Sequence, residues 1–221
     1  MDLEAFQQNH PTQTEEVVVR NRRYRLLLPK TLDSFIDPDD PMRDFPLWAK
    51  IWEASLVLAD ALAGMPPAPS RQILEIGCGA GLVGIVAASF GHRVTMTEYN
   101  PDALAFAQAN AQLNLSDSGE KLKIQRLDWH RPDLGGPFDL IVGSEVVYSE
   151  RDFEPLERLF KTFLKPGGEV ILAEGMRRTS MAFFQRLSES WEIEARRMTL
   201  RSQEKSMPVI LARLQRKASG L

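Results

Sequence analysis

Short apolar runs alternate with stretches of helical spacing along most of the chain. The apolar runs, which are typical of strands, lie at 73–76, 94–96, 122–127, 138–143 and 169–173. The stretches that predict helices, with apolar residues every three or four positions, lie at 82–87, 102–113, 153–163 and 178–190. Because strands that alternate with helices pair in parallel through right-handed crossovers, the pattern predicts an α/β fold.

The two ends of the chain depart from this alternation. Apolar runs at 191–200 and 209–214 have no helical stretch between them, so we expect them to pair antiparallel. With the five earlier runs they complete a Rossmann-like, doubly wound sheet of seven strands, mostly parallel with one reversed strand near the C-terminal edge. Near the N-terminus, 17–20 and 24–28 predict a β-hairpin after a polar helix or loose tail. We therefore divide the chain into an N-terminal extension, 1–44, and a main domain, 45–221.

Residues 45–62 have a helical period that aligns Trp48, Trp52, Leu56 and Ala59. The pattern predicts one helix over this range. Taken alone, the two tryptophans are more typical of a buried core than of a ligand site.

Three alternating glycines, Gly77, Gly79 and Gly81, follow the first strand of the predicted sheet and precede a helix. Glycine permits left-handed backbone angles and a close approach to a ligand, and a helix N-terminus favours polar or anionic groups. Glu98 ends the next strand, where a carboxylate can bind a ribose diol. The loop fits two patterns, the dinucleotide pattern G-x-G-x-x-G and the pattern E-x-G-x-G-x-G that begins at Glu75. The alternative to both is a tight strand-to-helix turn that binds no ligand.

Further polar positions follow the other predicted strands. Asp128 comes after the third strand, and residues 144–148 come after the fourth. Because ligands of parallel sheets bind at the carboxyl ends of the strands, we expect these positions, Gly77 and Glu98 to line one crevice.

Composition narrows the class of protein. The chain of 221 residues has 43% hydrophobic and 26% charged residues and a net charge of −3, as in an ordinary globular protein without a basic nucleic-acid-binding face. Cys78 is the single cysteine, so we expect neither a disulfide framework nor a cysteine metal cage, and no metal site. The polar, acidic start and the lack of a long apolar run predict a cytoplasmic protein that binds no membrane, and we expect a monomer.

The motifs, in order and spacing, resemble the class I methyltransferases that use S-adenosylmethionine (SAM), and more narrowly methyltransferase family 16, which includes many protein-lysine methyltransferases. The resemblance covers residues 45–214 and includes 51–54 as a tryptophan motif, 75–81 as the glycine motif and 144–148 as an acid-x-x-aromatic signature. It implies SAM as the cofactor, a protein substrate, and cofactor-binding roles for Trp52, Glu75, Gly77, Cys78, Gly79, Gly81, Glu98, Asp128, Trp129 and Ser144.

The same resemblance implies catalytic roles for Glu145 and Tyr148. The signature is often Asp-x-x-Tyr, and here Glu145 places the charge one methylene further out. A carboxylate at this position could hold a lysine ammonium and orient the amine, with Tyr148 closing the pocket. The alternatives are a small-molecule N- or O-methyltransferase and a SAM-binding protein without catalysis. A dehydrogenase is disfavoured because it does not account for Trp52, Asp128 and Trp129, or for the antiparallel end.

Overall fold

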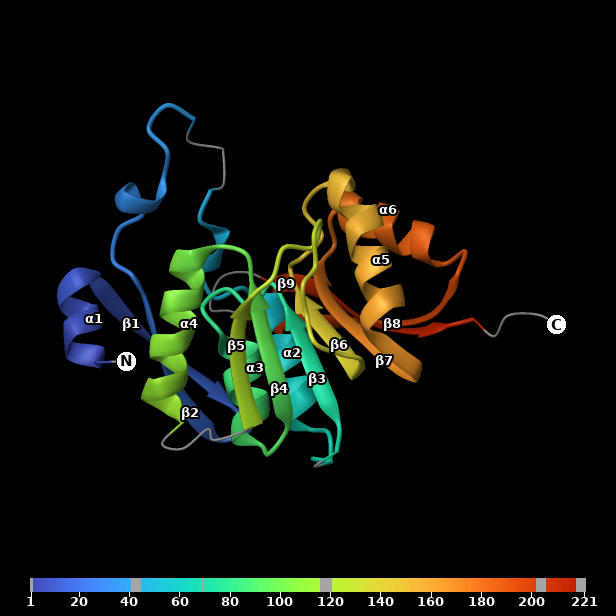
Figure 1. The fold of residues 1–221 in the computed structure, drawn as a ribbon, viewed down its shortest axis with the longest axis horizontal. Coiled ribbons are helices and arrows are strands. Elements are labelled where there is room, and N and C mark those ends of the chain that lie inside the picture. Colours follow the sequence, from blue (N-terminus) through green and yellow to red (C-terminus); the bar gives the residue numbers. More distant parts are fainter. Residues whose placement is uncertain (1, 41–44, 69, 116–120, 202–205, 218–221) are drawn as a thin grey trace.

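The computed structural model describes residues 2–40, 45–68, 70–115, 121–201 and 206–217 (Figure 1). Its centre is a seven-stranded sheet of order β5-β4-β3-β6-β7-β9-β8. The strands are β3 (Gln72–Ile76), β4 (Arg93–Glu98), β5 (Leu122–Arg126), β6 (Phe138–Ser144), β7 (Leu164–Gly175), β8 (Trp191–Arg201) and β9 (Ser206–Arg216). Of these strands, β9 alone runs against its neighbours, β7 and β8, so the predicted fold, with one reversed strand near an edge, is confirmed.

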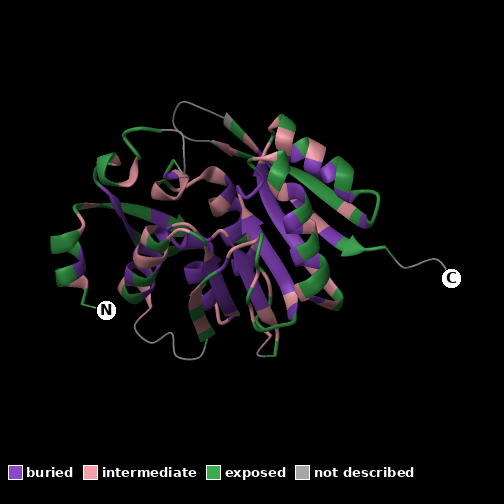
Figure 2. Ribbon diagram, turned by 45° about the horizontal axis from the view of Figure 1, so that its top comes forward, coloured by how far each residue is buried: buried purple, intermediate pink, exposed green. Residues whose placement is uncertain are grey.

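Helices cover both faces of the sheet, and Figure 2 shows the buried residues concentrated on the strands between them. The helices are α2 (Glu53–Ala63), α3 (Leu82–Ser89), α4 (Pro101–Asn114), α5 (Phe153–Phe163) and α6 (Arg178–Leu187). One apolar core joins α2, α3 and α4 to the face that carries Ile73 and Val142. The other joins α5 and α6 to the face that carries Leu74 and Ile141. Successive strand residues thus serve opposite cores, as expected for a sheet buried on both sides.

The N-terminal extension contains α1 (Leu3–Asn9) and a separate hairpin of β1 (Thr12–Val19) and β2 (Arg22–Pro29), which confirms the predicted hairpin. Its inward residues, Tyr24 and Leu26 among them, belong to the same core as α2 and α3. Phe6 and Leu27 form a smaller cluster with Phe106 of α4. The hairpin therefore packs directly on the helices that flank the glycine loop.

The helix predicted over residues 45–62 is wrong in its first half. Leu47–Ala49 form a single 3-10 turn, η2, and α2 begins only at Glu53. Trp52 caps α2 with an extended backbone, φ −93° and ψ 148°, and its indole Nε1 donates a hydrogen bond to the Leu47 carbonyl at 2.8 Å. This bond folds the segment back on itself, so the tryptophan spacing reflects a bent loop rather than a helical stripe.

Among the residues that the structure describes, no helix has both the length and the apolar character needed to cross a membrane.

Candidate active site

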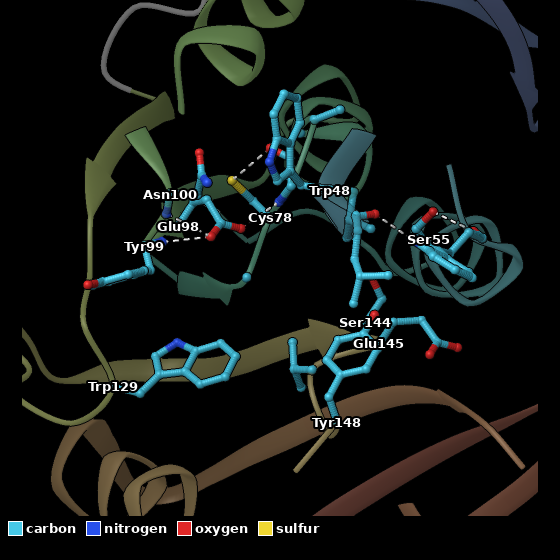
Figure 3. A pocket seen from close by; sticks show the side chains of 18 of the residues that line it. Trp48, Ser55, Cys78, Glu98, Tyr99, Asn100, Trp129, Ser144, Glu145 and Tyr148 are labelled. Atoms are coloured by element: carbon cyan, nitrogen blue, oxygen red, sulfur yellow. Dashed lines mark hydrogen bonds between the residues drawn. The ribbon is translucent and has the colours of Figure 1, made fainter. Parts of the chain in front are cut away.

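A cavity of about 830 Å³ lies at the carboxyl ends of β3, β4, β5 and β6 (Figure 3). Its walls come from the glycine loop, from the segments that follow β4, β5 and β6, and from the bent segment before α2. Parallel strands place their following loops at one edge of the sheet, which is why residues far apart in the sequence meet here. The volume suits a ligand of nucleoside size.

The glycine loop has left-handed backbone angles at all three predicted glycines: φ is +61° at Gly77, +52° at Gly79 and +92° at Gly81. A Cβ on Gly77 would lie 3.0 Å from Cγ1 of Val146 and 3.3 Å from Cζ2 of Trp129. Both the backbone angle and these close contacts therefore disfavour a side chain at this position. The loop ends at the N-terminus of α3.

Glu98 stands at the end of β4 and lines the cavity beside this loop. Its Oε2 accepts a hydrogen bond from the Gly79 N–H at 3.1 Å, and its Oε1 accepts from the N–H groups of Tyr99 and Asn100 at 2.7 and 3.1 Å. Three backbone donors thus hold the carboxylate in one orientation. Asn100 also caps α4, so the acid, the turn and the helix are fixed together.

Trp52 and Trp48 both line the cavity, although the sequence favoured a core position for Trp48. Trp52 is half-buried, with the Lys50 ammonium 4.5 Å from its ring centre. Trp48 is also half-buried, and its ring packs against Phe35 and Phe106 with centroids 5.2 Å away in each case. Trp48 therefore combines the two roles, wall of the cavity and part of an aromatic cluster.

Glu75, the acid that begins the glycine motif, does not line the cavity. It is buried beneath the loop, where the backbone of Gly84 hydrogen-bonds its carboxyl group, and burial raises its pKa to about 8. Its place under the loop is that of a support rather than a ligand. Cys78 does line the cavity, and burial, with the nearby Glu75 and Glu98, raises the pKa of its thiol. A thiol that stays protonated is a poor nucleophile.

The remaining predicted cofactor residues, Asp128, Trp129 and Ser144, all line the cavity. Asp128 accepts a hydrogen bond from the N–H of His130 at 2.8 Å, which closes the turn after β5. In Figure 3 the Trp129 indole extends toward the ring of Tyr148. The structure thus brings together every predicted cofactor residue except Glu75.

Glu145 and Tyr148 lie at the other end of the cavity, on the loop that follows β6. Glu145 has φ +52°, uncommon for a residue with a side chain, and its carboxylate is almost fully buried. That carboxylate accepts a hydrogen bond from the Gly175 N–H at 2.8 Å and forms an ion pair with Arg177. In Figure 3 the side chain of Glu145 runs away from Glu98 and Trp129. The Arg177 guanidinium also lies over the ring of Tyr148, 4.8 Å from its centre.

Glu174, which was not among the residues predicted from the sequence, supports this loop from the neighbouring strand, β7. It is fully buried at the end of β7 and accepts hydrogen bonds from the N–H groups of Val146 and Val147 at 2.8 and 3.3 Å. Its other oxygen pairs with Arg177 at 3.0 Å, and burial, with the neighbouring Glu145, raises its pKa to about 8. An acid at the carboxyl end of an apolar strand, as at Glu98, was the signal that could have identified it.

Comparison with known proteins agrees with this arrangement. Residues 44–190 match the family model described as lysine methyltransferase. The chain is 37% identical over 129 residues to protein N-lysine methyltransferase METTL21A of Danio rerio, covering 56% of this chain and 58% of the relative. It is 33% identical over 144 residues to EEF1A lysine methyltransferase 3 of Mus musculus, covering 63% and 61%. The matches thus span about six-tenths of the length of these curated relatives.

Solved structures share the fold at lower identity. Magnesium protoporphyrin IX methyltransferase of Synechocystis PCC 6803, with bound SAM, aligns with a TM-score of 0.57 at 19% identity, covering 73% of this chain and 79% of that one. Ribosomal protein L11 methylase of Lactobacillus delbrueckii aligns with a TM-score of 0.55 at 23% identity, covering 75% and 77%. The match to the family model over most of the main domain shows that this chain belongs to the lysine methyltransferase family, whose methyl donor is SAM.

Proposed function

We propose that the protein transfers a methyl group from SAM to a nitrogen of a protein acceptor, most simply the ε-amine of a lysine. One observation carries the proposal: a single cavity has the glycine loop and Glu98 at one end and Glu145 and Tyr148 at the other. The first end has the features of a nucleoside site, and the second has a charge and a ring suited to a cation. The names of the relatives support a protein acceptor.

The residues at the first end fit the cofactor. Gly77 leaves room where a Cβ would meet Val146 and Trp129. Glu98 presents a fixed carboxylate for a ribose diol, while Trp52, Trp129 and Asp128 supply aromatic and polar walls for the remaining parts. Bound SAM supplies an activated methyl group on a sulfonium, so the protein has mainly to align the acceptor and exclude water.

The residues at the second end suit an amine. A lysine has an unperturbed pKa of about 10.4, so it arrives charged and must lose a proton before it attacks. Glu145 is the acid we assign to hold that charge, with the exposed Tyr148 ring beside it. Its present partner, Arg177, has a side chain that is 36% exposed, so the guanidinium can move toward solvent when an ammonium enters.

A second acceptor is supported by a specific observation. Because Arg177 already neutralises Glu145, the acceptor end suits an uncharged nitrogen as well, such as an imidazole. A relative named histidine protein methyltransferase 1 homolog, from Dictyostelium discoideum, is 31% identical over 129 residues, covering 56% of this chain and 41% of the relative. A small-molecule N- or O-methyltransferase is the alternative outside protein substrates. Action in the cytoplasm, a monomeric state and no binding of nucleic acid stay predictions.

The test is incubation of the purified protein with a cell lysate and SAM labelled in its methyl group. We expect label in a protein band, and methyl-lysine after acid hydrolysis of that band. Methylhistidine in the hydrolysate would favour the second acceptor, and label confined to the small-molecule fraction would overturn the proposal of a protein substrate.

A further inference from the structure

The outer edge of the N-terminal hairpin, along β2, is covered by side chains of the main domain. Within the part of the chain that the structure describes, β2 pairs with a strand on one side only, β1, which leaves N–H and C=O groups of alternate residues on its other side. Two asparagines of α4 bind these groups as a neighbouring strand would. Asn110 accepts from Leu27 N–H at 2.7 Å and donates to Leu27 C=O at 3.1 Å, and Asn114 does the same for Arg25 at 2.9 and 2.7 Å.

The two asparagines differ in their remaining N–H. Asn110 donates it to the carbonyl of Ala80, at 3.0 Å, between the second and third glycines of the loop. Asn114 donates it to the carbonyl of Asn110, at 2.8 Å, within its own helix. Asn110 is fully buried and forms three hydrogen bonds, so its amide orientation is fixed by its partners. Of the two asparagines, Asn110 is therefore the one that links the hairpin to the glycine loop.

A second contact joins the same regions. Phe106, one helical turn before Asn110, packs against Phe6 of α1 with ring centroids 5.0 Å apart and against Trp48 at 5.2 Å. A Cβ built on Gly79 would lie 3.6 Å from the backbone of Trp48, so this cluster also backs the loop. The side of α4 that carries Phe106 and Asn110 is thus in contact with the extension and with the cavity wall.

We propose that Asn110 is a positioning residue of the cofactor site, through which the N-terminal hairpin fixes the conformation of the glycine loop. The inference rests on the proposed function, because it takes this cavity as the SAM site. It assigns a role in cofactor binding to part of the extension, Leu27 included, which lies outside the residues 44–190 that match the family model. The Ala80 carbonyl sets the plane of the peptide that leads into Gly81, so its loss of a partner frees the loop.

The experiment compares Asn110→Leu with Asn114→Leu in the full chain. Both variants remove a pair of hydrogen bonds to β2, so both should lower the melting temperature. We expect the dissociation constant for S-adenosylhomocysteine, measured by calorimetry, to rise about tenfold or more in Asn110→Leu and to stay within about twofold of wild type in Asn114→Leu. Equal weakening in both variants, or unchanged binding in Asn110→Leu, would overturn the inference.

Two further results distinguish a failure of this inference from a failure of the proposed function and from a variant that does not fold. If the wild-type chain binds no S-adenosylhomocysteine, the proposed function and the inference fail together, whereas binding that survives Asn110→Leu refutes the inference alone. If Asn110→Leu does not fold, amide exchange of the wild-type chain decides. Coupling is reciprocal, so S-adenosylhomocysteine should slow exchange of the Leu27 amide more than that of the Arg25 amide. Equal effects on the two amides would rule out the link.

Discussion

At the Glu98 end of the cavity, backbone hydrogen bonds and backbone angles hold the ligand-binding groups in place. At the Glu145 end, ion pairs between side chains hold the acceptor-binding groups. Glu98 is held by three backbone N–H groups, and the glycine loop by its left-handed angles. Glu145 is held by one N–H and by an ion pair with Arg177, which itself is shared with Glu174. The first end is therefore ready for a ligand, and the second must rearrange its charges to accept a cation.

The largest effect should come from blocking the glycine loop. In Gly79→Val the branched side chain is forced into φ +52°, a left-handed conformation that β-branched residues avoid. We expect the dissociation constant for S-adenosylhomocysteine, measured by calorimetry, to rise by at least about 10²-fold.

Gly167 provides the matched control. It has φ +75°, a Cβ placed on it would have no atom of the described residues within 4 Å, and it does not line the cavity. Gly167→Val carries a comparable backbone penalty of about 1–2 kcal/mol and should bind the ligand like wild type. If the two variants lose affinity equally, general destabilisation rather than the loop explains the loss.

The next largest effect should come from removing the charge at the Glu145 end. Glu145→Gln should lower kcat/KM by roughly 10²-fold in a methyl-transfer assay on the labelled acceptor, because a positioned acid contributes on that scale. Affinity for S-adenosylhomocysteine should change less than about twofold, and Glu145→Asp should restore part of the activity.

Glu157 supplies the comparison for that variant. It is also paired with an arginine, Arg186 at 3.1 Å, but lies on α5 outside the cavity. Glu157→Gln should retain wild-type turnover. A Glu145→Gln variant that turns over at the wild-type rate would show that the charge has no part in the reaction and would favour an uncharged acceptor.

The two tryptophans should separate binding from stability. Trp52→Ala should weaken S-adenosylhomocysteine binding by about tenfold, since Trp52 lies at the cavity wall, and should lower stability by only about 1 kcal/mol, since its indole forms one hydrogen bond, to Leu47. Trp48→Ala should weaken binding and also lower the free energy of unfolding in urea by about 3 kcal/mol, because it opens the cluster with Phe35 and Phe106. Unchanged stability of Trp48→Ala would contradict its place in that cluster.

The smallest effect on function should come from Glu75. Its folded-state pKa, about 8, lies above the value of 4.5 for an unperturbed glutamate, so the folded chain keeps a proton that the unfolded chain releases. This group therefore contributes full stability below about pH 4.5 and loses it as the pH rises toward 8. Glu75→Gln should lie close to wild type in urea unfolding at pH 5 and exceed it by about 4 kcal/mol at pH 8, because each pKa unit corresponds to about 1.4 kcal/mol. A variant less stable than wild type at pH 8 would show that Glu75 is needed as an anion.

The order of strands and helices followed from the sequence because each element has its own period and its own ends. The glycine loop could be predicted equally well, since only glycine adopts its backbone angles at little cost. The conformation of the segment before α2 could not be predicted in this way. The spacing of Trp48 and Trp52 fits a helix, but the hydrogen bond from Trp52 to Leu47 bends the chain instead.

The Glu145 end could be predicted only in part, for a related reason. Glu145 and Tyr148 stand in a local signature, but their partners Glu174 and Arg177 lie about thirty residues further along the chain and meet them only because β6 and β7 are neighbours. Asn110 likewise has its partners in β2 and in the glycine loop. Side-chain networks between distant segments depend on the assembled fold, so a one-dimensional pattern does not contain them.

The most direct test of the account is a calorimetric titration of the wild-type chain with S-adenosylhomocysteine, set beside one with NAD. The fixed Glu98 carboxylate and the glycine loop predict a single nucleoside site, and the match to the lysine methyltransferase family selects its ligand. We therefore expect a micromolar dissociation constant for S-adenosylhomocysteine and no heat of binding with NAD. Tight binding of NAD, or no binding of S-adenosylhomocysteine, would contradict the assignment of this cavity.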